Sequence, residues 1–195
     1  MIRYFDILFS LIGIIIFSPL FLFLSIVINL ESRGGCIYKQ IRVGKNGKDF
    51  LLYKFRSMRK DSDKKSLITI GGRDLRVTKV GYFIRKYKLD ELPQLFNVLK
   101  GDMSLVGPRP EVRKYVEMYT LDQQIVLSIR PGITDYASIE YSNENEILEL
   151  SEDPEYTYIH EIMPQKIALN MKYINSYNLL EYFKLIIFTL IKVFK

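Results

Sequence analysis

Residues 89–97 read Leu89-Asp90-Glu91-Leu92-Pro93-Gln94-Leu95-Phe96-Asn97, which places two adjacent carboxylates at the predicted start of a helix. We expect Asp90 to cap this helix, because a capping carboxylate accepts hydrogen bonds from free backbone N–H groups and proline is tolerated in the first turn. Gly101 is expected to end it. Its apolar stripe comprises Leu92, Leu95, Phe96 and Leu99. Acids at a helix start are common structural caps, so the pair needs further context.

Basic side chains surround this acidic pair in the sequence. A carboxylate can attack phosphorus when a divalent cation and arginines neutralise the phosphate charge, and arginine binds phosphate through two N–H groups at once. We therefore interpret Asp90 and Glu91 as candidate catalytic and metal-binding residues. Lys54 and Arg56 either bind lipid headgroups or extend their charges to water. The full set of candidate substrate-binding residues is Lys54, Arg56, Arg76, Arg85, Arg109 and Arg130.

The composition restricts the class of partner. The chain has 195 residues, enough for one domain of ordinary size, and carries a net charge of +6. This charge favours an anionic partner such as nucleic acid, anionic lipid or a phosphorylated small molecule. Because the sequence has a single cysteine, Cys36, and a single histidine, His160, a Cys/His zinc site within one chain is excluded. We expect any metal to be a hard cation bound by oxygen, such as Mg²⁺.

The N-terminal segment is long enough to enter or cross a membrane. Residues Ile7 to Leu30 are almost wholly apolar, and a bilayer core of about 30 Å requires roughly 20 such residues as a helix. A secretory signal peptide fits poorly, because the run is too long, Asp6 precedes it and no small-residue cleavage site follows. Two topologies remain open: a straight transmembrane helix, and a re-entrant helix that enters and leaves by the same face.

Two features favour the re-entrant helix. Ser18-Pro19 lies near the middle of the apolar run, where proline kinks a helix and the Ser18 hydroxyl can partner the freed carbonyl group. Basic residues flank both ends, which marks both flanks as cytoplasmic. They are Arg3 before the run, and Arg33, Lys39, Arg42, Lys45 and Lys48 after it. We therefore predict a re-entrant membrane helix hairpin over residues 1–33 and a cytoplasmic catalytic domain over residues 34–195.

A second amphipathic pattern lies near the C-terminus. Apolar residues recur there at helical spacing, with lysines between them, and predict a helix. Such a helix either lies in the membrane interface or packs into the core of the soluble part, and both interpretations stay open. The apolar positions are Leu179, Leu180, Phe183, Ile186, Ile187, Leu190, Ile191 and Phe194.

The remaining patterns predict an α+β fold that is rich in helix. Strands at Cys36 to Ile41 and Phe50 to Phe55 are expected to form a hairpin across the turn residues 44–47. Thr78 is expected to cap a helix that reaches about Lys88. Residues 60–72 are polar and predict a loop. Further predictions are a helix over Glu111 to Tyr119, a helix from a cap at Asp122 through Ile129, and a loop-like segment over residues 141–165 with a helical piece at Glu144 to Leu150.

Motifs for several other activities are absent from the sequence. There is no G-x-x-x-x-G-K-[ST] loop, no G-x-G-x-x-G opening a helix and no recognisable nucleic-acid module. The apolar N-terminal segment also argues against a nucleic-acid partner. A non-catalytic membrane-surface adaptor whose basic face binds anionic lipid stays open as the alternative, although the adjacent Asp90 and Glu91 favour an enzyme.

An ordered set of motifs makes the chain recognisable. The motifs are Phe17-Ser18-Pro19, Gln40-x-Arg42-Val43-Gly44, Tyr53-Lys54-Phe55-Arg56-Ser57-Met58, Arg76-x-Thr78-x-x-Gly81, the stretch from Leu89 to Ser104, Gly107-Pro108-Arg109-Pro110 and Arg130-Pro131-Gly132-Ile133-Thr134. Together they resemble the bacterial sugar transferases of the monotopic phosphoglycosyl transferase superfamily. The length of the chain is similar to that of the small, PglC-like class.

This resemblance implies an enzyme that moves a sugar 1-phosphate from a UDP-sugar to undecaprenyl phosphate, the first membrane step of glycoconjugate biosynthesis. Asp90 would attack the β-phosphate, releasing UMP and forming a covalent phosphosugar-aspartate that the polyprenol phosphate then attacks. Mg²⁺ would bridge carboxylate and phosphates, and Glu91 would position the metal or accept a proton. The resemblance further implies monotopic attachment to the cytoplasmic face of the bacterial inner membrane, an N-acetylated amino sugar as the transferred group, and it allows a homodimer.

The chain departs from the family pattern after Thr134. Asp135-Tyr136-Ala137-Ser138 stands where the family usually has Gly-Trp-Ala-Gln, and Tyr141-Ser142-Asn143-Glu144-Asn145 replaces a run of the Asn-Gly-Arg-Asn type. The second change removes an expected arginine and adds acid. Because this region is expected to border the sugar or nucleotide pocket, the departure bears on the identity of the sugar.

Overall fold

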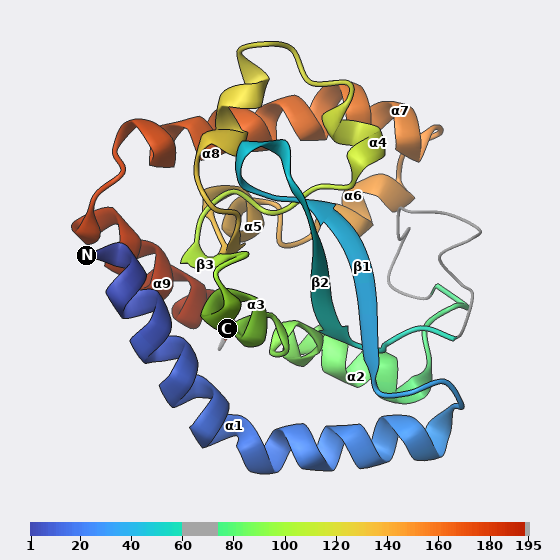
Figure 1. The fold of residues 1–195 in the computed structure, drawn as a ribbon. Coiled ribbons are helices and arrows are strands. Elements are labelled where there is room, and N and C mark those ends of the chain that lie inside the picture. The colour runs from blue at the N-terminus through green and yellow to red at the C-terminus, as the bar shows by residue number, and fades with distance from the viewer. Residues whose placement is uncertain (60–73, 194–195) are drawn as a thin grey trace.

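A long N-terminal helix runs along the left and lower edge of the view in Figure 1, and a β-hairpin lies between the helices at the bottom and those at the top. The computed structural model describes residues 1–59 and 74–193, so the predicted loop at residues 60–72 and the apolar Phe194 lie outside the described residues.

The helices are α1 (Ile2–Glu31), α2 (Lys79–Lys86), α3 (Gln94–Lys100), α4 (Arg113–Val116), α5 (Tyr136–Glu140), α6 (Glu144–Glu149), α7 (Pro154–Thr157), α8 (Met163–Asn175) and α9 (Leu179–Val193). The strands are β1 (Ile37–Val43), β2 (Asp49–Phe55), β3 (Ser104–Val106) and β4 (Gly132–Thr134). Short 3-10 helices are η1 (Lys45–Gly47), η3 (Leu89–Glu91) and η4 (Gln123–Ser128), and η5 (Tyr158–Ile162) is a π-helical turn. The predicted α+β class, rich in helix, is confirmed.

The predicted hairpin is confirmed by β1 and β2, which pair antiparallel. The register places Ile37 opposite Phe55 and Val43 opposite Asp49. In the turn, Asn46 has a φ of +57°, a left-handed conformation that asparagine tolerates better than most residues. The buried side chains of Val43 and Phe55 face the rest of the molecule and hold the hairpin against it.

No sequence pattern predicts the second pair of strands, because three residues are too few to show alternation. β3 and β4 run parallel, with Ser104 opposite Gly132 and Val106 opposite Thr134. A Cβ atom on Gly132 would lie 2.1 Å from the backbone nitrogen of Gly107. The two segments can therefore approach this closely only because glycine has no side chain.

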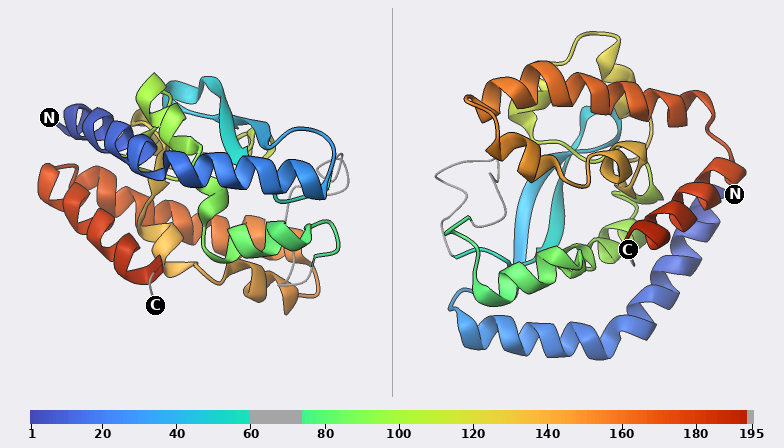
Figure 2. Two further views of the ribbon diagram at one scale, coloured as in Figure 1. Left: turned by 90° about the horizontal axis from the view of Figure 1, so that it is seen from below. Right: turned by 180° about the vertical axis from the view of Figure 1, so that it is seen from behind.

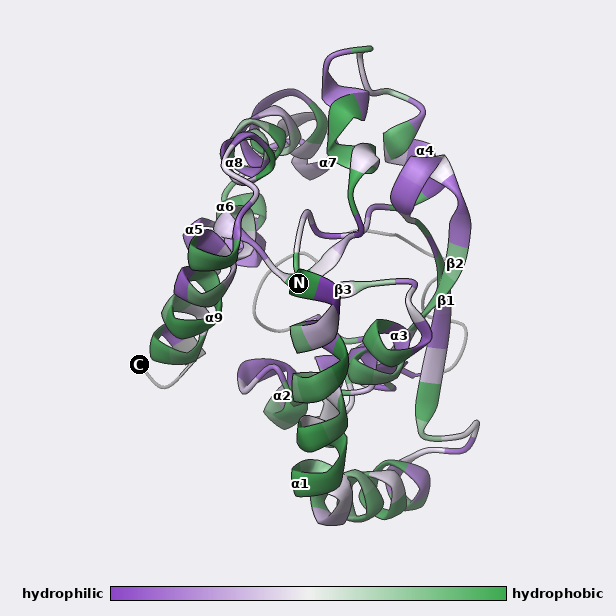
Figure 3. Cartoon of the chain, turned by 60° about the vertical axis from the view of Figure 1, so that its left-hand side comes forward, coloured by the Kyte–Doolittle hydropathy of each residue, from purple (hydrophilic) through white to green (hydrophobic). Residues whose placement is uncertain are grey.

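Helix α1 bends about half-way along its length (Figure 1). Pro19 lies inside it and has no N–H for the carbonyl group of Ile15, and the Ser18 hydroxyl donates to that carbonyl at 2.8 Å instead. This contact confirms the expected role of Ser18. Helix α1 is hydrophobic along most of its length (Figure 3). Many of its apolar side chains are exposed, among them Ile15, Leu22 and Leu30. Within residues 1–59 and 74–193, α1 is the one helix long and apolar enough to cross a membrane, judged by length and composition.

Both ends of α1 are bonded to the same folded body. Near the N-terminus, Arg3 donates to the carbonyl groups of Val98 at 2.6 Å and Leu99 at 2.9 Å, at the end of α3. At the other end, both oxygens of Glu31 lie 3.2 Å from the backbone nitrogen of Val80, in the first turn of α2. The right-hand view of Figure 2 shows α2 and α3 on the inner side of the bend. The bend is what allows both contacts at once.

A buried carboxylate, Asp6, joins α1 to β3 and α9. One of its oxygens accepts hydrogen bonds from the Ser104 hydroxyl, the Leu105 backbone and the Tyr182 hydroxyl, each at 2.9 Å. Such partners are what a buried carboxylate requires. Tyr182 and Leu185 bury one face of α9, as the core interpretation expects. The opposite face remains exposed and apolar at Leu180, Ile187, Phe188, Leu190 and Ile191.

Helix boundaries differ from the sequence predictions in the middle of the chain. Thr78 caps α2 as predicted, since its hydroxyl accepts from the backbone nitrogen of Gly81 at 2.9 Å. The helix predicted over residues 111–119 is reduced to α4, because the Glu111 carbonyl accepts from Val43 on β1 instead of joining a helix. The helix predicted after Asp122 is the 3-10 helix η4, and the Asp122 side chain makes no cap.

The loop-like prediction for residues 141–165 is wrong in its second half. The helical piece is confirmed as α6, but residues 154–162 are also helical and lead directly into α8. Tyr158 and Ile162 are buried in the same core cluster as Ile167. Exposed acidic residues are frequent along this segment, so the apolar positions that become buried do not stand out and the sequence resembles a loop. Burial in the tertiary structure nevertheless stabilises a helix.

Candidate active site

Asp90 and Glu91 lie in the 3-10 turn η3 and not at the start of α3. The predicted cap at Asp90 is wrong, because α3 begins at Gln94 with Pro93 in the cap position. A cap at Asp90 would use the backbone N–H of Leu92 or of residue 93; the Leu92 N–H donates to the Leu89 carbonyl at 3.3 Å, and Pro93 has no N–H. Just before the turn, Lys88 has a φ of +55°, which is uncommon for a residue other than glycine. This backbone turn directs both acids toward the hairpin.

The Glu91 carboxylate lies between two cations. Its Oε1 is 3.1 Å from the Nζ of Lys54 on β2 and also contacts the Nη2 of Arg109. The Nη1 of Arg109 is 3.3 Å from Oε2, so the guanidinium binds both carboxylate oxygens. The structure therefore brings together η3, β2 and the loop after β3. We call Lys54, Asp90, Glu91 and Arg109 the acidic-pair cluster.

The two carboxyl groups of this cluster have opposite electrostatic surroundings. Burial on its own would raise the pKa of Glu91, but Arg109 and Lys54 outweigh it and hold that pKa well below the usual range. Burial raises the pKa of Asp90 above its usual value, although the charge of Lys54 acts in the opposite sense. Glu91 is therefore the more strongly stabilised anion of the pair, and Asp90 is the more weakly stabilised one.

Asp90 has the freer carboxylate of the pair. It is 7% exposed, and no described residue donates a hydrogen bond to it. Arg85, at the end of α2, and Lys88 also lower its pKa, so the predicted basic surroundings contribute. A carboxylate that is near cations yet not engaged in hydrogen bonds can use its lone pairs for a ligand or an electrophile.

Three predicted substrate-binding residues make their described contacts elsewhere. Arg56 is buried, and its Nη2 lies 3.0 Å from the Ser32 hydroxyl and contacts the Ser32 carbonyl, at the C-terminal end of α1. Arg76 pairs with Asp74, with Nη2 and Oδ2 2.6 Å apart. The Nε of Arg130 donates to the carbonyl of Gly101 at 2.9 Å, at the end of α3. Their roles toward substrate stay predictions, whereas Lys54 and Arg109 join the cluster.

One carboxylate of the cluster suits a divalent cation. Mg²⁺ usually binds proteins through one or two carboxylates together with substrate phosphates. Asp90 fits this requirement, while both oxygens of Glu91 are already bonded to Arg109 and Lys54. Among the described residues, no group of three or more Asp, Glu, His or Cys side chains could hold a metal without substrate. The role of Glu91 as a metal ligand stays a prediction.

Arg42 and Glu111 form a supporting pair that the residue patterns did not single out as functional. The Nη1 of Arg42 lies 3.1 Å from Oε1 of Glu111 and 3.1 Å from the carbonyl oxygen of Pro110. Tyr158 donates from its hydroxyl to the other oxygen of Glu111. These contacts hold the loop directly after Arg109. The sequence feature that could have identified this pair is the motif Gln40-x-Arg42, because its two side chains are bonded to each other.

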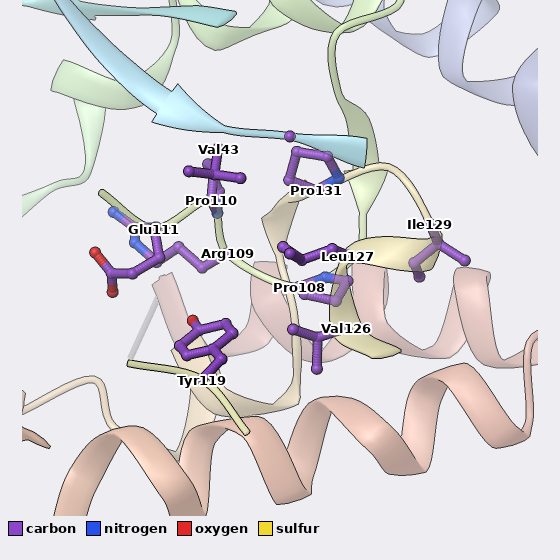
Figure 4. Close-up of a pocket in the computed structure, with 11 residues that line it drawn as sticks. Val43, Pro108, Arg109, Pro110, Glu111, Tyr119, Val126, Leu127, Ile129 and Pro131 are labelled. Carbon is purple, nitrogen blue, oxygen red and sulfur yellow. The ribbon is translucent and has the colours of Figure 1, made fainter. Parts of the chain in front are cut away.

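A largely apolar pocket adjoins the cluster behind the Gly107–Pro110 loop (Figure 4). Arg109 and Glu111 lie at one end of it, and the ring of Tyr119 lies below them. Arg109 belongs to both the pocket and the cluster. The pocket is lined by Val43, Gly44, Pro108, Arg109, Pro110, Glu111, Tyr119, Val126, Leu127, Ile129 and Pro131.

Comparison with known proteins identifies relatives of this chain by sequence. The UDP-N-acetylgalactosamine-undecaprenyl-phosphate N-acetylgalactosaminephosphotransferase of Aeromonas hydrophila is 47% identical over 137 residues, which cover 69% of this chain and 32% of that protein. The UDP-glucose:undecaprenyl-phosphate glucose-1-phosphate transferase of Klebsiella pneumoniae is 37% identical over 193 residues, covering 97% of this chain and 39% of that protein. The undecaprenyl-phosphate galactose phosphotransferase of Salmonella typhimurium is 44% identical over 157 residues, which cover 73% of this chain and 33% of that protein.

The matched region thus spans well under half the length of these relatives. The family model described as bacterial sugar transferase matches residues 1–195, the whole of this chain. The resemblance drawn from the motifs is confirmed, and the chain belongs to the bacterial sugar transferase family.

Proposed function

We propose that this chain transfers a sugar 1-phosphate from a UDP-sugar to undecaprenyl phosphate at the surface of the bacterial inner membrane. The observation that carries the proposal is the contrast within the acidic-pair cluster. Glu91 is bonded to Arg109 and Lys54, while Asp90 beside it accepts no hydrogen bond from a described residue. The names of the relatives, which specify undecaprenyl phosphate as acceptor, support the choice of lipid.

The first chemical step uses Asp90 as the nucleophile. A carboxylate oxygen of Asp90 forms a bond to the β-phosphorus of the UDP-sugar, and the bond from that phosphorus to the bridging oxygen breaks. UMP leaves with the electron pair, and the sugar phosphate remains on Asp90. Arg109 and Lys54 supply positive charge beside the phosphate oxygens. Bound Mg²⁺, held by Asp90 and phosphate oxygens, would add the charge of a Lewis acid.

The second step regenerates the carboxylate. A phosphate oxygen of undecaprenyl phosphate bonds to the phosphorus of the aspartyl phosphosugar, and the bond to Asp90 breaks with its electron pair returning to the carboxylate. No proton needs to move if the lipid phosphate arrives ionised. Glu91 stays ionised throughout and keeps Arg109 and Lys54 in place.

The transferred sugar is proposed to be an N-acetylated amino sugar. The name of the Aeromonas relative specifies N-acetylgalactosamine, whereas those of the Klebsiella and Salmonella relatives specify glucose and galactose. The departure from the family pattern over residues 135–145 lies in α5 and α6, beside the loop that carries Arg109. A panel of UDP-sugars containing all three sugar types therefore decides this point.

A re-entrant α1 accounts best for the membrane topology. Arg3 bonds one end of α1 to α3, and Glu31 bonds the other end to α2. A straight span would place these two ends on opposite sides of the bilayer, although both are bonded to the same folded body. Entry and exit by one face, with the bend at Pro19 inside the bilayer, avoids this conflict. We place that face on the cytoplasmic side. The division at residue 33 and a homodimer stay predictions.

The test of the proposed function is UMP release. The wild-type protein, reconstituted with undecaprenyl phosphate and Mg²⁺, should release UMP from one of the UDP-sugars, and Asp90→Asn should abolish it. Intact-protein mass spectrometry without acceptor should detect an added sugar phosphate on the wild type and none on Asp90→Asn. Release at the wild-type rate by this variant would remove Asp90 as nucleophile.

The matched control is Asp122→Asn, which makes the same change at an exposed side chain without a capping contact. It should keep full activity. If the wild type released no UMP from any UDP-sugar and bound anionic vesicles regardless of Asp90 and Glu91, the adaptor function would replace the enzyme.

A further inference from the structure

Asp135 is a fully buried carboxylate between β4 and α5, and its two oxygens have different partners. Oδ1 accepts from the backbone nitrogen of Ser138 at 2.6 Å and so caps α5. Oδ2 accepts from the backbone nitrogen of Arg109 at 3.0 Å. One side chain therefore joins the start of α5 to the residue whose guanidinium binds Glu91.

The cap on α5 does not by itself explain a buried charge at position 135. One acceptor oxygen is enough for a helix cap, and serine or asparagine would provide it without burying a carboxylate. Burying a carboxylate is unfavourable unless it receives hydrogen bonds, and the second bond goes to Arg109. A hydrogen bond to a charged acceptor is also about twice as strong as a neutral one.

The amide of Arg109 is the one backbone donor within Pro108-Arg109-Pro110, because proline has no N–H. The backbone on either side of it is held by other contacts. Gly107 donates to the Thr134 carbonyl at 3.0 Å, and the Pro110 carbonyl accepts from Arg42 at 3.1 Å. Asp135 thus accepts the hydrogen bond from the one N–H group that Pro108-Arg109-Pro110 can donate.

We propose that Asp135 is a positioning residue that holds the backbone of Arg109 so that its guanidinium stays on Glu91. Asp135 itself does not touch the reacting atoms. Its kinetic consequence rests on the proposed function, whereas its effect on the mobility of Arg109 does not. The negative charge of Asp135 also attracts the Arg109 guanidinium. Glu91 and, more weakly, Asp135 raise the pKa of Arg109.

Two substitutions separate the cap from the contact with Arg109. Asp135→Ser retains a capping oxygen for Ser138 and is too short to keep the second bond. Asp135→Asn keeps the size of the side chain with one acceptor oxygen, so it can satisfy one of the two N–H groups. The matched control is Asp153→Ser, because Asp153 caps α7 through the backbone nitrogen atoms of Glu155 and Tyr156 at a site with no described contact to Arg109.

The first measurement is the mobility of the Arg109 side chain, from ¹⁵N relaxation of its Nε–H group, with Arg109→Lys identifying the resonance. In the wild type and in Asp153→Ser we expect an order parameter of about 0.8, and in Asp135→Ser a value below about 0.6. Asp135→Asn, which packs like the wild type, should fall between them. An order parameter unchanged in both Asp135 variants would overturn the proposal.

The second measurement is a double-mutant cycle on UMP release. Asp135→Ser should lower kcat/KM for the UDP-sugar about tenfold in the wild type and less than about twofold in an Arg109→Gln background, because the pathway through Arg109 is then already lost. Equal losses in both backgrounds would indicate a merely structural role and contradict the proposal. If the wild type released no UMP, the proposed function would fail while the relaxation measurement still decided the role of Asp135.

Discussion

Arg109 binds Glu91 through both nitrogens of its guanidinium fork, with Nη1 3.3 Å from Oε2 and Nη2 in contact with Oε1. Asp90, the adjacent residue in the sequence, has no such partner among the described residues. The two neighbouring acids therefore do different work. Glu91 is bonded to Lys54 and Arg109, and the Asp90 oxygens accept no hydrogen bond from a described residue.

Glu91→Gln should lower the free energy of unfolding by about 3 kcal/mol at pH 7, because Arg109 and Lys54 would lose their counter-ion in a largely buried site. The lowered pKa of Glu91 sets the pH dependence. Its stabilising contribution is complete above the ordinary glutamate pKa and is lost as the pH falls toward the depressed value. Chemical denaturation in detergent at pH 7 and pH 4 should show the difference between the two proteins shrinking.

The control for this change is Glu155→Gln, since Glu155 forms an ion pair with Lys114 whose two side chains are about half exposed. An exposed pair is worth at most about 1 kcal/mol. Equal losses for the two variants would mean that burial of the Glu91 pair has no energetic consequence.

Asp90→Asn should have the opposite effect on stability while abolishing activity. Burial raises the pKa of Asp90, so its ionised form destabilises the native protein at neutral pH. Replacing it by a neutral amide should raise the free energy of unfolding by about 1 kcal/mol at pH 7, and the gain should vanish as the pH falls below the ordinary aspartate pKa, where both states are protonated. Denaturation in detergent at pH 7 and pH 2.5 checks the sign, because pH 2.5 lies more than one unit below the ordinary aspartate pKa of about 3.9. A variant less stable than the wild type at pH 7 would show that Asp90 is stabilised in its charged form.

Tyr182→Phe should destabilise the junction of α1, β3 and α9. The substitution removes one of the hydrogen bonds to the buried carboxylate of Asp6, at a cost of about 1–2 kcal/mol. Tyr177→Phe is the matched control, because Tyr177 is 49% exposed and no described residue bonds to its hydroxyl. Thermal unfolding of both variants in the same detergent measures the difference, and equal melting temperatures would argue against a strong bond at Asp6.

Pro19→Ala should change the topology of α1. The new N–H can bond to the carbonyl of Ile15 and restores a straight helix, which favours spanning the bilayer over re-entry. With Tyr4→Cys as the reporter and Cys36→Ser, the protein with Pro19 should be labelled from the cytoplasmic side, and Pro19→Ala should be labelled in part from outside. Ser25→Ala, elsewhere in α1, should behave like the wild type. Outside labelling of the protein with Pro19 would instead support a straight span.

Local patterns predicted much of the secondary structure, and for identifiable reasons. The hairpin followed from two strand-like runs around a turn, and the caps at Thr78 and the stop at Gly101 depend on neighbours within a few residues. The cap at Asp90 failed because the Leu92 N–H donates to the Leu89 carbonyl and Pro93 has no N–H, so neither donor that the cap would use is free. Residues 154–162 were missed although Asp153 caps α7 and Pro154 lies in its first turn, and burial against Ile167 and its neighbours adds to this local signal.

The sequence by itself determined the family, the apolar bent helix at Ser18-Pro19 and the identity of the acidic pair, because these depend on residue types at short spacing. Only the tertiary structure decided which cations join that pair. Lys54 and Arg109 reach Glu91 from segments 37 and 18 residues away, and Arg56 and Arg130 instead bond to the ends of α1 and α3. Contacts at such separations depend on how the elements pack, and that packing also gave Asp90 and Glu91 their opposite pKa shifts.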